Sequence, residues 1–361
     1  MIKVECQAQL VVRDAEGREA SLTDVVPLLA LVAEEGSIAQ AAQRKGLSYR
    51  HAWGLLREVE ERLGGALIAK ARGRGSVLSE LGEAVLRSQR LCGERLQGNL
   101  QALASEVASD LNRWLVPHAL DLRIHASHGY AVASLVTALV AQQLPVEIKY
   151  RDSVDAITAL ARGECDLAGF HLPRGDFRAA CADAYRGWLD PQRHVFIHLT
   201  RRKQGLFVGR GNPKQIAGLA DLARGDIRFV NRQPGSGTRM LIDLLLTRIG
   251  VDPGRVNGYA SSELTHSAIA AFVASGMADV GFGVEPAAHH FGLDFMPIAD
   301  EDYYFACDRA QLEREPLAAV LALLRGAAFR QNVARLEGYD PADCGKVVAL
   351  DAGWAGLEPA L

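Results

Sequence analysis

The sequence of 361 residues contains little that could hold a metal ion, cross-link the chain or span a membrane. Its six cysteines are scattered and form no C-x-x-C pair, which argues against a zinc site or a disulfide framework and favours a reducing compartment. No apolar run approaches membrane-spanning length, and the first residues alternate in polarity instead of forming a signal-peptide core. We therefore expect a cytoplasmic protein with no metal site and no membrane partner.

Signatures of catalysis are also missing. The sequence has no nucleophile elbow, no H-E-x-x-H motif, no dinucleotide fingerprint and no Walker loop ending in Gly-Lys-Ser/Thr. We therefore predict no catalytic residues and no cofactor. The length predicts two or three domains, and a content of 49% hydrophobic and 23% charged residues is ordinary for a globular protein.

The formal net charge of −3 is unevenly distributed along the chain. Between Arg44 and Arg74, eight lysines and arginines stand against three glutamates. A basic segment in a mildly acidic chain indicates contact with a polyanion at one end of the protein. A solvated helix face would have the same composition, so the interpretation depends on the local fold.

The residues from 36 to 53 predict a helix-turn-helix. Ser37 can cap the first helix, with Gln40 completing a capping box, and Ser48 can cap the second after a turn at residues 45–47. The second helix would bury an apolar face and present its polar first turn to a DNA major groove. The residues that we expect at the DNA are Ser37, Ser48, Tyr49, Arg50 and His51.

Elements on either side complete a winged helix. Residues 2–12 alternate in polarity like a half-buried strand, residues 18–22 could return as its partner, and residues 24–35 predict a supporting helix. After the second helix of the motif, residues 67–78 predict two short strands around a tip of glycine and arginine. Two arginines in that tip could reach backbone phosphates, which gives affinity without sequence choice; they are Arg72 and Arg74.

From Ser79 to about Leu115 the sequence predicts one long helix with an apolar stripe. Either a second copy of the chain or the neighbouring domain could cover the stripe, and periodicity alone does not decide between them. We favour a dimer, because two-fold symmetric operators are read by two-fold symmetric proteins. The stripe comprises Leu96, Leu100, Leu103, Val107, Leu111 and Trp114.

After residue 121, short strands alternate with helices. This rhythm predicts parallel sheets with ligands at the carboxyl ends of the strands, and two such runs separated by a crossover indicate two lobes with a cleft. The fold class is therefore α/β. We predict a winged helix-turn-helix over residues 1–80, a long dimerisation helix and linker over 81–121, and a two-lobed domain over 122–361.

The loop P-G-S-G-T-R over residues 234–239 is the most distinctive feature of the second half. Its glycines let the backbone curl, while Ser236 and Thr238 offer hydroxyls beside the free N–H groups of a helix start, a combination suited to an oxyanion. Arg239 would add a direct charge or a supporting clamp. A plain capped helix after a glycine turn would have the same sequence.

Other strand-to-helix junctions would bring further polar side chains to the same edge. Each of these residues alone is more simply a helix cap or a packed imidazole, but their convergence favours a binding cleft. The residues that we expect to bind an effector are Ser127, His128, Ser153, His171, Ser236, Gly237, Thr238, Arg239, Thr265, His266 and Tyr303.

The N-terminal third resembles the winged-helix domain of the molybdate-responsive regulator ModE, among relatives of the LysR-type winged helix. The matching segments are Gly36-Ser-Ile, Ala41-Ala42, Ser48-Tyr-Arg-His-Ala-Trp53 and Leu78-Ser-Glu-Leu-Gly82. The resemblance implies that the capped helix reads a double-stranded DNA operator and that the long helix forms a homodimer or a higher homo-oligomer. The second half departs from ModE, whose effector domain is a pair of small β-barrels.

From about residue 122 the chain resembles cytoplasmic domains related to type II periplasmic binding proteins. The matching segments are residues 231–239, Thr265-His266 and Ala278-Asp-Val-Gly-Phe-Gly283. In molybdate- and tungstate-binding relatives, hydroxyls and backbone N–H groups from several loops hold a tetrahedral oxyanion. The resemblance thus implies a small anionic effector, with molybdate or tungstate as the first expectation, and its counterparts here are Ser127, Ser153, Ser236, Thr238 and Thr265.

The sequence therefore predicts a transcription factor that senses an oxyanion. One alternative keeps the regulator but gives it an organic effector, such as a molybdenum-cofactor precursor or a small carboxylate; the aromatic content of 6% slightly favours the small ligand. Another alternative is a solute-binding or enzymatic domain whose helix-turn-helix serves only in oligomerisation. The lack of catalytic spacing and of a signal peptide weighs against it.

Overall fold

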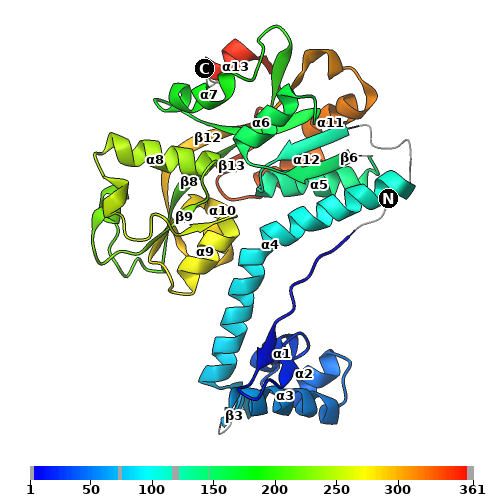
Figure 1. The fold of residues 1–361 in the computed structure, drawn as a ribbon, viewed down its shortest axis with the longest axis vertical. Helices are drawn as coiled ribbons and strands as arrows, with labels where there is room; N and C mark the ends of the chain where they lie inside the picture. The colour runs from blue at the N-terminus through cyan, green and yellow to red at the C-terminus, as the bar shows by residue number, and fades with distance from the viewer. Residues whose placement is uncertain (1–3, 72–74, 116–121, 145, 356–361) are drawn as a thin grey trace. The chain divides into compact units, whose positions relative to one another are not determined.

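The computed structural model describes residues 4–71, 75–115, 122–144 and 146–355 (Figure 1). Contacts divide the chain into two compact units. The smaller unit is Gln7–Gln97, and the larger unit comprises Gly98–Leu361 together with the residues before Gln7. The division falls inside one continuous helix, between the predicted boundaries at residues 80 and 121.

The helices of the smaller unit enclose one apolar core, in which Leu28, Leu29 and Ala52 are fully buried. Ser37 and Ser48 cap two of these helices as predicted, because their hydroxyls accept from the backbone N–H groups three residues later. The elements are α1 (Val25–Glu35), α2 (Ile38–Arg44), α3 (Tyr49–Leu63) and a wing of β3 (Ile68–Ala71) and β4 (Gly75–Leu78).

The N-terminal hairpin is shorter than the alternation predicts. Strands β1 (Val11–Arg13) and β2 (Glu19–Ser21) pair antiparallel, whereas residues 4–10 alternate in burial without joining a sheet. The prediction of a strand over residues 2–12 was therefore wrong in its extent, because an alternating pattern needs a hydrogen-bonded partner to become a strand. Arg72 and Arg74, predicted at the tip of the wing, lie outside the described residues.

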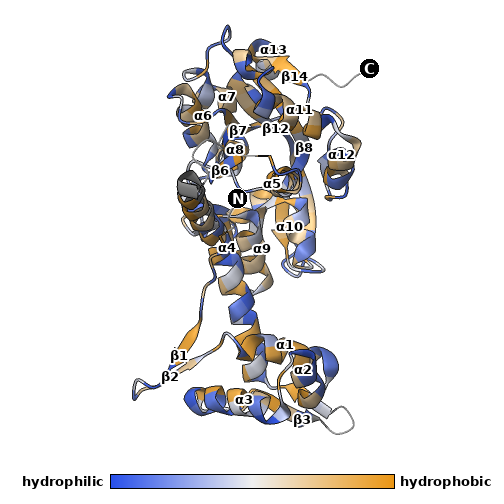
Figure 2. Ribbon diagram, turned by 90° about the vertical axis from the view of Figure 1, so that its right-hand side faces the viewer, coloured by the Kyte–Doolittle hydropathy of each residue, from blue (hydrophilic) through white to orange (hydrophobic). Residues whose placement is uncertain are grey.

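Helix α4 (Glu80–Leu115) is a single helix of 36 residues, as predicted. Ser79 precedes it and accepts a hydrogen bond from Gly82 N at 3.0 Å. Hydrophobic residues recur along α4 (Figure 2), and four members of the predicted stripe are exposed in the single chain. They are Leu96, Leu103, Val107 and Leu111, while the side chain of Trp114 lies outside the described ones.

The larger unit is built on one sheet, whose strand order among the described residues is β10-β9-β11-β8-β12-β7-β5-β6, with β13 and β14 paired to β8. Three parallel strands form the first lobe and three the second, as the βα rhythm predicts. The strands are β5 (Leu122–Ala126), β6 (Val146–Tyr150), β7 (Leu167–Pro173), β9 (Phe229–Arg232), β10 (Ser262–Glu263), β11 (Val280–Val284), β13 (Tyr339–Asp340) and β14 (Val347–Ala349).

Two long antiparallel strands, β8 (His194–Val208) and β12 (Asp294–Asp308), run through both lobes. The sequence predicts two separate strands, over 195–199 and 206–208, and this prediction was wrong. The polar residues between them stay in the strand because buried partners satisfy them. Arg202 Nε lies 2.5 Å and Gln204 Nε2 2.7 Å from Glu301 Oε1 on β12.

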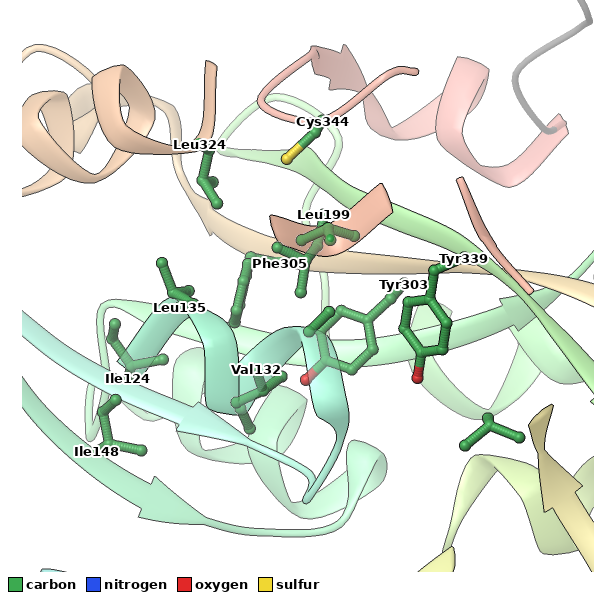
Figure 3. Close-up of a cluster of buried hydrophobic side chains, with 14 of the residues drawn as sticks. Ile124, Val132, Leu135, Ile148, Leu199, Tyr303, Phe305, Leu324, Tyr339 and Cys344 are labelled. Atoms are coloured by element: carbon green, nitrogen blue, oxygen red, sulfur yellow. The ribbon is translucent and has the colours of Figure 1, made fainter. Parts of the chain in front are cut away.

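Helices cover the sheet and connect its strands (Figure 1). The first-lobe core packs Ile124, Leu135, Leu199 and Phe305 together, with the hydroxyl group of Tyr303 at one end (Figure 3). The helices are α5 (Tyr130–Ala141), α6 (Ser153–Ala161), α7 (Arg178–Arg186), α8 (Gly237–Arg248), α9 (His266–Ala274), α10 (Glu285–His290), α11 (Glu315–Arg325), α12 (Ala327–Ala334) and α13 (Leu350–Ala355), with short 3-10 turns at Leu219–Ala223, Pro253–Arg255 and Arg309–Gln311.

No helix in the described part of the chain combines the length and the apolar character that crossing a bilayer requires. Among the same residues, no group of three or more His, Cys, Asp or Glu side chains is placed around a possible metal position.

Candidate functional site

Strand-to-helix junctions of the two lobes meet along a line that we call the inter-lobe seam. The seam consists of residues 127–130, 152–153 and 171 from the first lobe and residues 232–238 and 264–267 from the second. Gln233 Nε2 donates to both carboxylate oxygens of Asp152, at 2.9 and 3.0 Å. Tyr130 Oη and Ser267 Oγ lie 2.9 Å apart. The lobes are therefore bridged directly by side chains.

His171 lies at the centre of the first-lobe side of the seam. Its Nδ1 lies 3.0 Å from Ser153 Oγ, its Nε2 lies 3.5 Å from Ser127 Oγ, and its ring packs edge-on against Tyr303. A Cβ atom at Gly237 would lie 3.2 Å from the His171 side chain, so the second lobe approaches closely here. The structure thus brings together five of the residues that the sequence predicts.

Arg232 is the residue that sequence analysis missed. It ends strand β9, and its side chain is 4% exposed. Its Nε and Nη1 atoms are buried and have no hydrogen-bond partner among the described residues. Burial lowers the pKa of Arg232 to about 10. The charge of Asp152 acts to raise this pKa, and the charge of Arg202 lowers it further. A basic residue at the end of a buried strand was the available signal.

His266, in the first turn of α9, adds a second unsatisfied donor or acceptor. The side chain is buried, and its Nδ1 has no hydrogen-bond partner among the described residues. Burial lowers the pKa of His266 well below its usual value, as do Arg232, Arg202 and His171. Burial and the same two arginines likewise lower the pKa of His171.

We refer to Arg202, Arg232, His171 and His266 as the basic cluster. Arg202 is bound to Glu301, and Asp152 is bound to Gln233, so neither carboxylate supplies a hydrogen bond to Arg232. The cluster can therefore donate hydrogen bonds to an anion through the N–H groups of Arg232 that have no partner among the described residues.

The hydroxyls predicted to cradle the ligand are largely committed elsewhere. Ser236 Oγ caps α8 by accepting from Arg239 N, and it donates to the carbonyl of Gln233 at 3.1 Å. The Ser236 hydroxyl therefore has no proton left for a ligand in this structure, because a hydroxyl has only one to donate. Thr265 Oγ1 caps α9 by accepting from Ala268 N. Thr238 accepts from Gln204 Nε2 at 2.9 Å and keeps its own proton to donate.

Arg239 acts as a supporting clamp and does not itself reach the cluster. Its Nε pairs with Asp243 at 2.9 Å, its guanidinium lies 4.1 Å from the ring centroid of Tyr259, and its Nη1 donates to the carbonyl of Arg232 at 3.2 Å. Of the two roles predicted for Arg239, the structure therefore supports the indirect one.

His128 faces a different neighbour from the rest of the predicted site. Its ring stacks on Tyr150 with centroids 3.9 Å apart, and its imidazole interacts with the backbone of Gly98 on α4. Burial lowers the pKa of His128 to about 4, so the imidazole is neutral at pH 7.

In the smaller unit, α3 turns a preorganised polar and aromatic face outward. Tyr49 and Trp53 are exposed and stack with ring centroids 6.4 Å apart, and the Arg57 guanidinium lies 5.3 Å from the Trp53 ring. Arg50 and His51 are exposed as well. Other basic residues of this segment pair with carboxylates: Arg44 with Glu34 and Glu35, Lys45 with Asp24, and Arg62 with Asp14.

Gly54 lies in the middle of this outward face and was also missed. A Cβ atom there would meet nothing within 4 Å, and its φ is not positive, so neither packing nor backbone conformation requires glycine. With Arg50 and Arg57 it follows a spacing of four and three residues, opposite the buried Ala52 and Leu56. Between two exposed arginines, a helix glycine that packing does not require allows close approach of a ligand.

Comparison with known families identifies both halves of the chain. The family model for the bacterial regulatory helix-turn-helix protein, lysR family, matches residues 26–83. The model for the PBP superfamily domain matches residues 137–325, more than half of the chain. The chain belongs to the PBP superfamily. It combines a helix-turn-helix domain of the LysR type with a PBP-like domain, and the narrower likeness to ModE stays a prediction.

Individual relatives of this chain are distant. YvgK, an uncharacterized protein of Bacillus subtilis (strain 168), is 36% identical over 207 residues, which cover 57% of the chain and 66% of YvgK. An uncharacterized protein in the ferredoxin 2Fe-2S gene 5' region of Clostridium pasteurianum is 27% identical over 110 residues, 30% of the chain and 97% of that protein. Among solved structures, a peroxide-bound mutant of Corynebacterium glutamicum OxyR is 16% identical, with a TM-score of 0.44, over 86% of the chain and 92% of OxyR.

Proposed function

We propose that this protein is a transcriptional regulator, a cytoplasmic homodimer whose PBP-like domain binds a small oxyanion, molybdate or tungstate first, at the basic cluster. The observation that carries the proposal is the buried guanidinium of Arg232, whose Nε and Nη1 lack partners among the described residues. A charge buried in this way is normally paired or hydrogen-bonded. An anion from solution would supply the missing partner.

The energy available from such a contact is sufficient for signalling. A hydrogen bond to a charged group contributes about 1.5–3 kcal/mol, and Arg232 offers two nitrogens without partners among the described residues, with Thr238 and His266 on neighbouring elements. Shifting a regulator from mostly one state to mostly the other takes about 5.5 kcal/mol of discrimination. Two or three such bonds, formed only when both lobes close on the anion, reach that value.

Burial favours a compact ligand. Every member of the basic cluster is at most 5% exposed, which suits a tetrahedral anion better than a long pterin. A surface hollow of about 790 Å³ lies elsewhere, between α7 and α13, and is lined by residues that include Arg186 and Trp354. Because Trp354 offers an aromatic ring for stacking, this hollow is the place to examine if the effector is organic.

We assign DNA reading to the outward face of α3, with Arg50, Gly54 and Arg57 toward the groove and Tyr49 beside them. The charge argument favours this face, because Arg50 and Arg57 lack ion-pair partners among the described residues. Arg72 and Arg74 stay predicted phosphate contacts of the wing. The exposed stripe of α4 is the surface that a second copy would cover, which places two α3 helices on a two-fold symmetric operator.

Thermal denaturation with molybdate, tungstate, sulfate and phosphate, each added separately, tests the sensing half. An anion at a hundredfold excess over its dissociation constant should stabilise the chain by about 2.7 kcal/mol. Arg232→Met should abolish that response without lowering the melting temperature of the ligand-free protein, because it removes an unsatisfied buried charge. Arg228→Met serves as the control, since Arg228 is exposed and pairs with Asp279 on the surface. An undiminished response in Arg232→Met would refute the site.

DNA binding is tested by fluorescence anisotropy with a duplex selected from random sequence by the full chain. Arg50→Ala should weaken binding to the selected duplex and reduce its salt dependence. Unchanged binding in Arg50→Ala would reject α3 as the reading helix. No stabilisation by any of the four anions would direct the search to an organic effector.

A further inference from the structure

Helix α4 touches the inter-lobe seam at Gly98, which belongs to the larger unit. Gly98 is buried, although glycine is unfavourable inside a helix. The reason lies in its neighbours. A Cβ atom at this position would lie 2.6 Å from Thr265 Cγ2, closer than real Cβ atoms approach other atoms, and 3.0 Å from Leu264 Cδ2, which is a tight contact. Only glycine lets α4 lie against this loop.

The contact involves both lobes. Leu264 and Thr265 form the loop before α9 in the second lobe, and Thr265 caps that helix. From the first lobe, the imidazole of His128 interacts with the backbone of Gly98 itself. One peptide of α4 is therefore held simultaneously by the loop after β5 and by the loop before α9.

Each of these loops leads directly into the basic cluster. Ser127, next to His128, contacts His171, and His266 follows Thr265 in the chain. Any change in the separation of the lobes at the cluster must also change the distance between His128 and Thr265. Because both hold Gly98, such a change cannot leave α4 where it is.

We infer that Gly98 is the positioning residue through which the two lobes set the position of α4, and that anion binding at the seam reaches the DNA-binding unit by this contact. The inference rests on the proposed sensing function for its input. Its structural part, that both lobes jointly hold α4, does not depend on the identity of the effector. The signal travels along α4 because that helix continues without a break from Gly98 back to Glu80.

The test compares Gly98→Ala with Gly93→Ala in the full chain. Both replace a helical glycine of α4 and gain the same helix propensity, but a Cβ at position 93 meets nothing within 4 Å. Affinity for the selected DNA duplex is measured by anisotropy, without anion and with saturating tungstate. Melting curves with tungstate report anion binding separately.

Without anion, we expect Gly98→Ala to change the dissociation constant for DNA by about fivefold or more, the usual lower range of coupling between sites, and Gly93→Ala to leave it unchanged. With tungstate, Gly98→Ala should still show the melting shift but lose the response of DNA affinity. Thr265→Ser removes the methyl group that clashes and keeps the capping hydroxyl, so the double variant should restore wild-type behaviour.

A Gly98→Ala protein that binds DNA as the wild type does, with and without anion, would overturn the inference. Failure of Thr265→Ser to rescue a defective Gly98→Ala protein would also count against it, since the defect would then not come from this contact. If tungstate leaves wild-type melting unchanged while Gly98→Ala still alters DNA affinity, the proposed anion fails and the positioning role of Gly98 stands.

Discussion

Replacing Gly54 by alanine should raise stability and lower DNA affinity at the same time. Glycine inside a helix costs about 0.5–1 kcal/mol relative to alanine, and the added methyl group meets no atom of the protein within 4 Å. We therefore expect the free energy of unfolding of Gly54→Ala to rise by the whole of this amount. For a unit of this size it corresponds to an increase in melting temperature of roughly 2–8 °C.

DNA affinity should change in the opposite direction. If α3 lies against the DNA groove at Gly54, the added methyl group has no space between the helix and the DNA. An extra methyl group in such a close-packed contact typically costs about 1–3 kcal/mol. That cost corresponds to a roughly 5- to 150-fold weaker dissociation constant. Gly54→Leu should bind more weakly still while gaining nearly the same helix propensity, so that the loss follows side-chain size.

Circular dichroism melting and anisotropy with the selected duplex measure the two effects on the same preparations. Gly93→Ala provides the reference for helix propensity in the melting experiment. Wild-type DNA affinity in both Gly54→Ala and Gly54→Leu would refute the assignment of this face to the groove. A loss of affinity accompanied by a loss of stability would show instead that the structure around Gly54 is less open than described.

Three further predictions concern stability and assembly. Asp302 is fully buried among Arg174, Arg178 and His198, which hold its pKa at about 2 despite burial, so Asp302→Asn should lower the free energy of unfolding in urea by about 3–5 kcal/mol. Lowering the pH from 7 to 5 should lower the melting temperature. His171 and His266 stay neutral in the folded protein, whereas in the unfolded chain they take up protons below about pH 6.5, so protonation favours unfolding. The variant His266→Gln should show a smaller change of melting temperature with pH. Leu103→Glu on the exposed stripe of α4 should convert the proposed dimer into monomers in analytical ultracentrifugation, whereas Arg95→Glu at another exposed position of α4 should not.

Local signals in the sequence were enough for much of the fold. The caps at Ser37 and Ser48, the length of α4 and the alternation of strands and helices each depend on neighbouring residues, and the structure has them as predicted. The continuity of β8 was not predictable in this way. Two of its polar middle residues, Arg202 and Gln204, are held by Glu301, about a hundred residues away in the sequence.

The candidate site, too, could be predicted only where its residues follow from local sequence signals. Sequence reasoning placed Ser127, Ser153 and His171 at one edge, because the topology of parallel strands dictates it. It assigned the ligand role to the loop at Ser236, since a capping hydroxyl and a ligand-binding hydroxyl have identical sequence surroundings. Arg232 became a candidate because two buried nitrogens of its guanidinium have no hydrogen-bond partner among the described residues. Such a missing contact can be recognised only in a three-dimensional structure.

The shared central strands β8 and β12 also determine how the PBP-like half comes apart. Each passes through both lobes and pairs with the other from His194–Asp308 at one end to Val208–Asp294 at the other. Neither lobe can melt without breaking strands that the other needs, so a single cooperative transition is expected for both. Their amide protons should exchange last, and at nearly the same rate along the whole length of the pair.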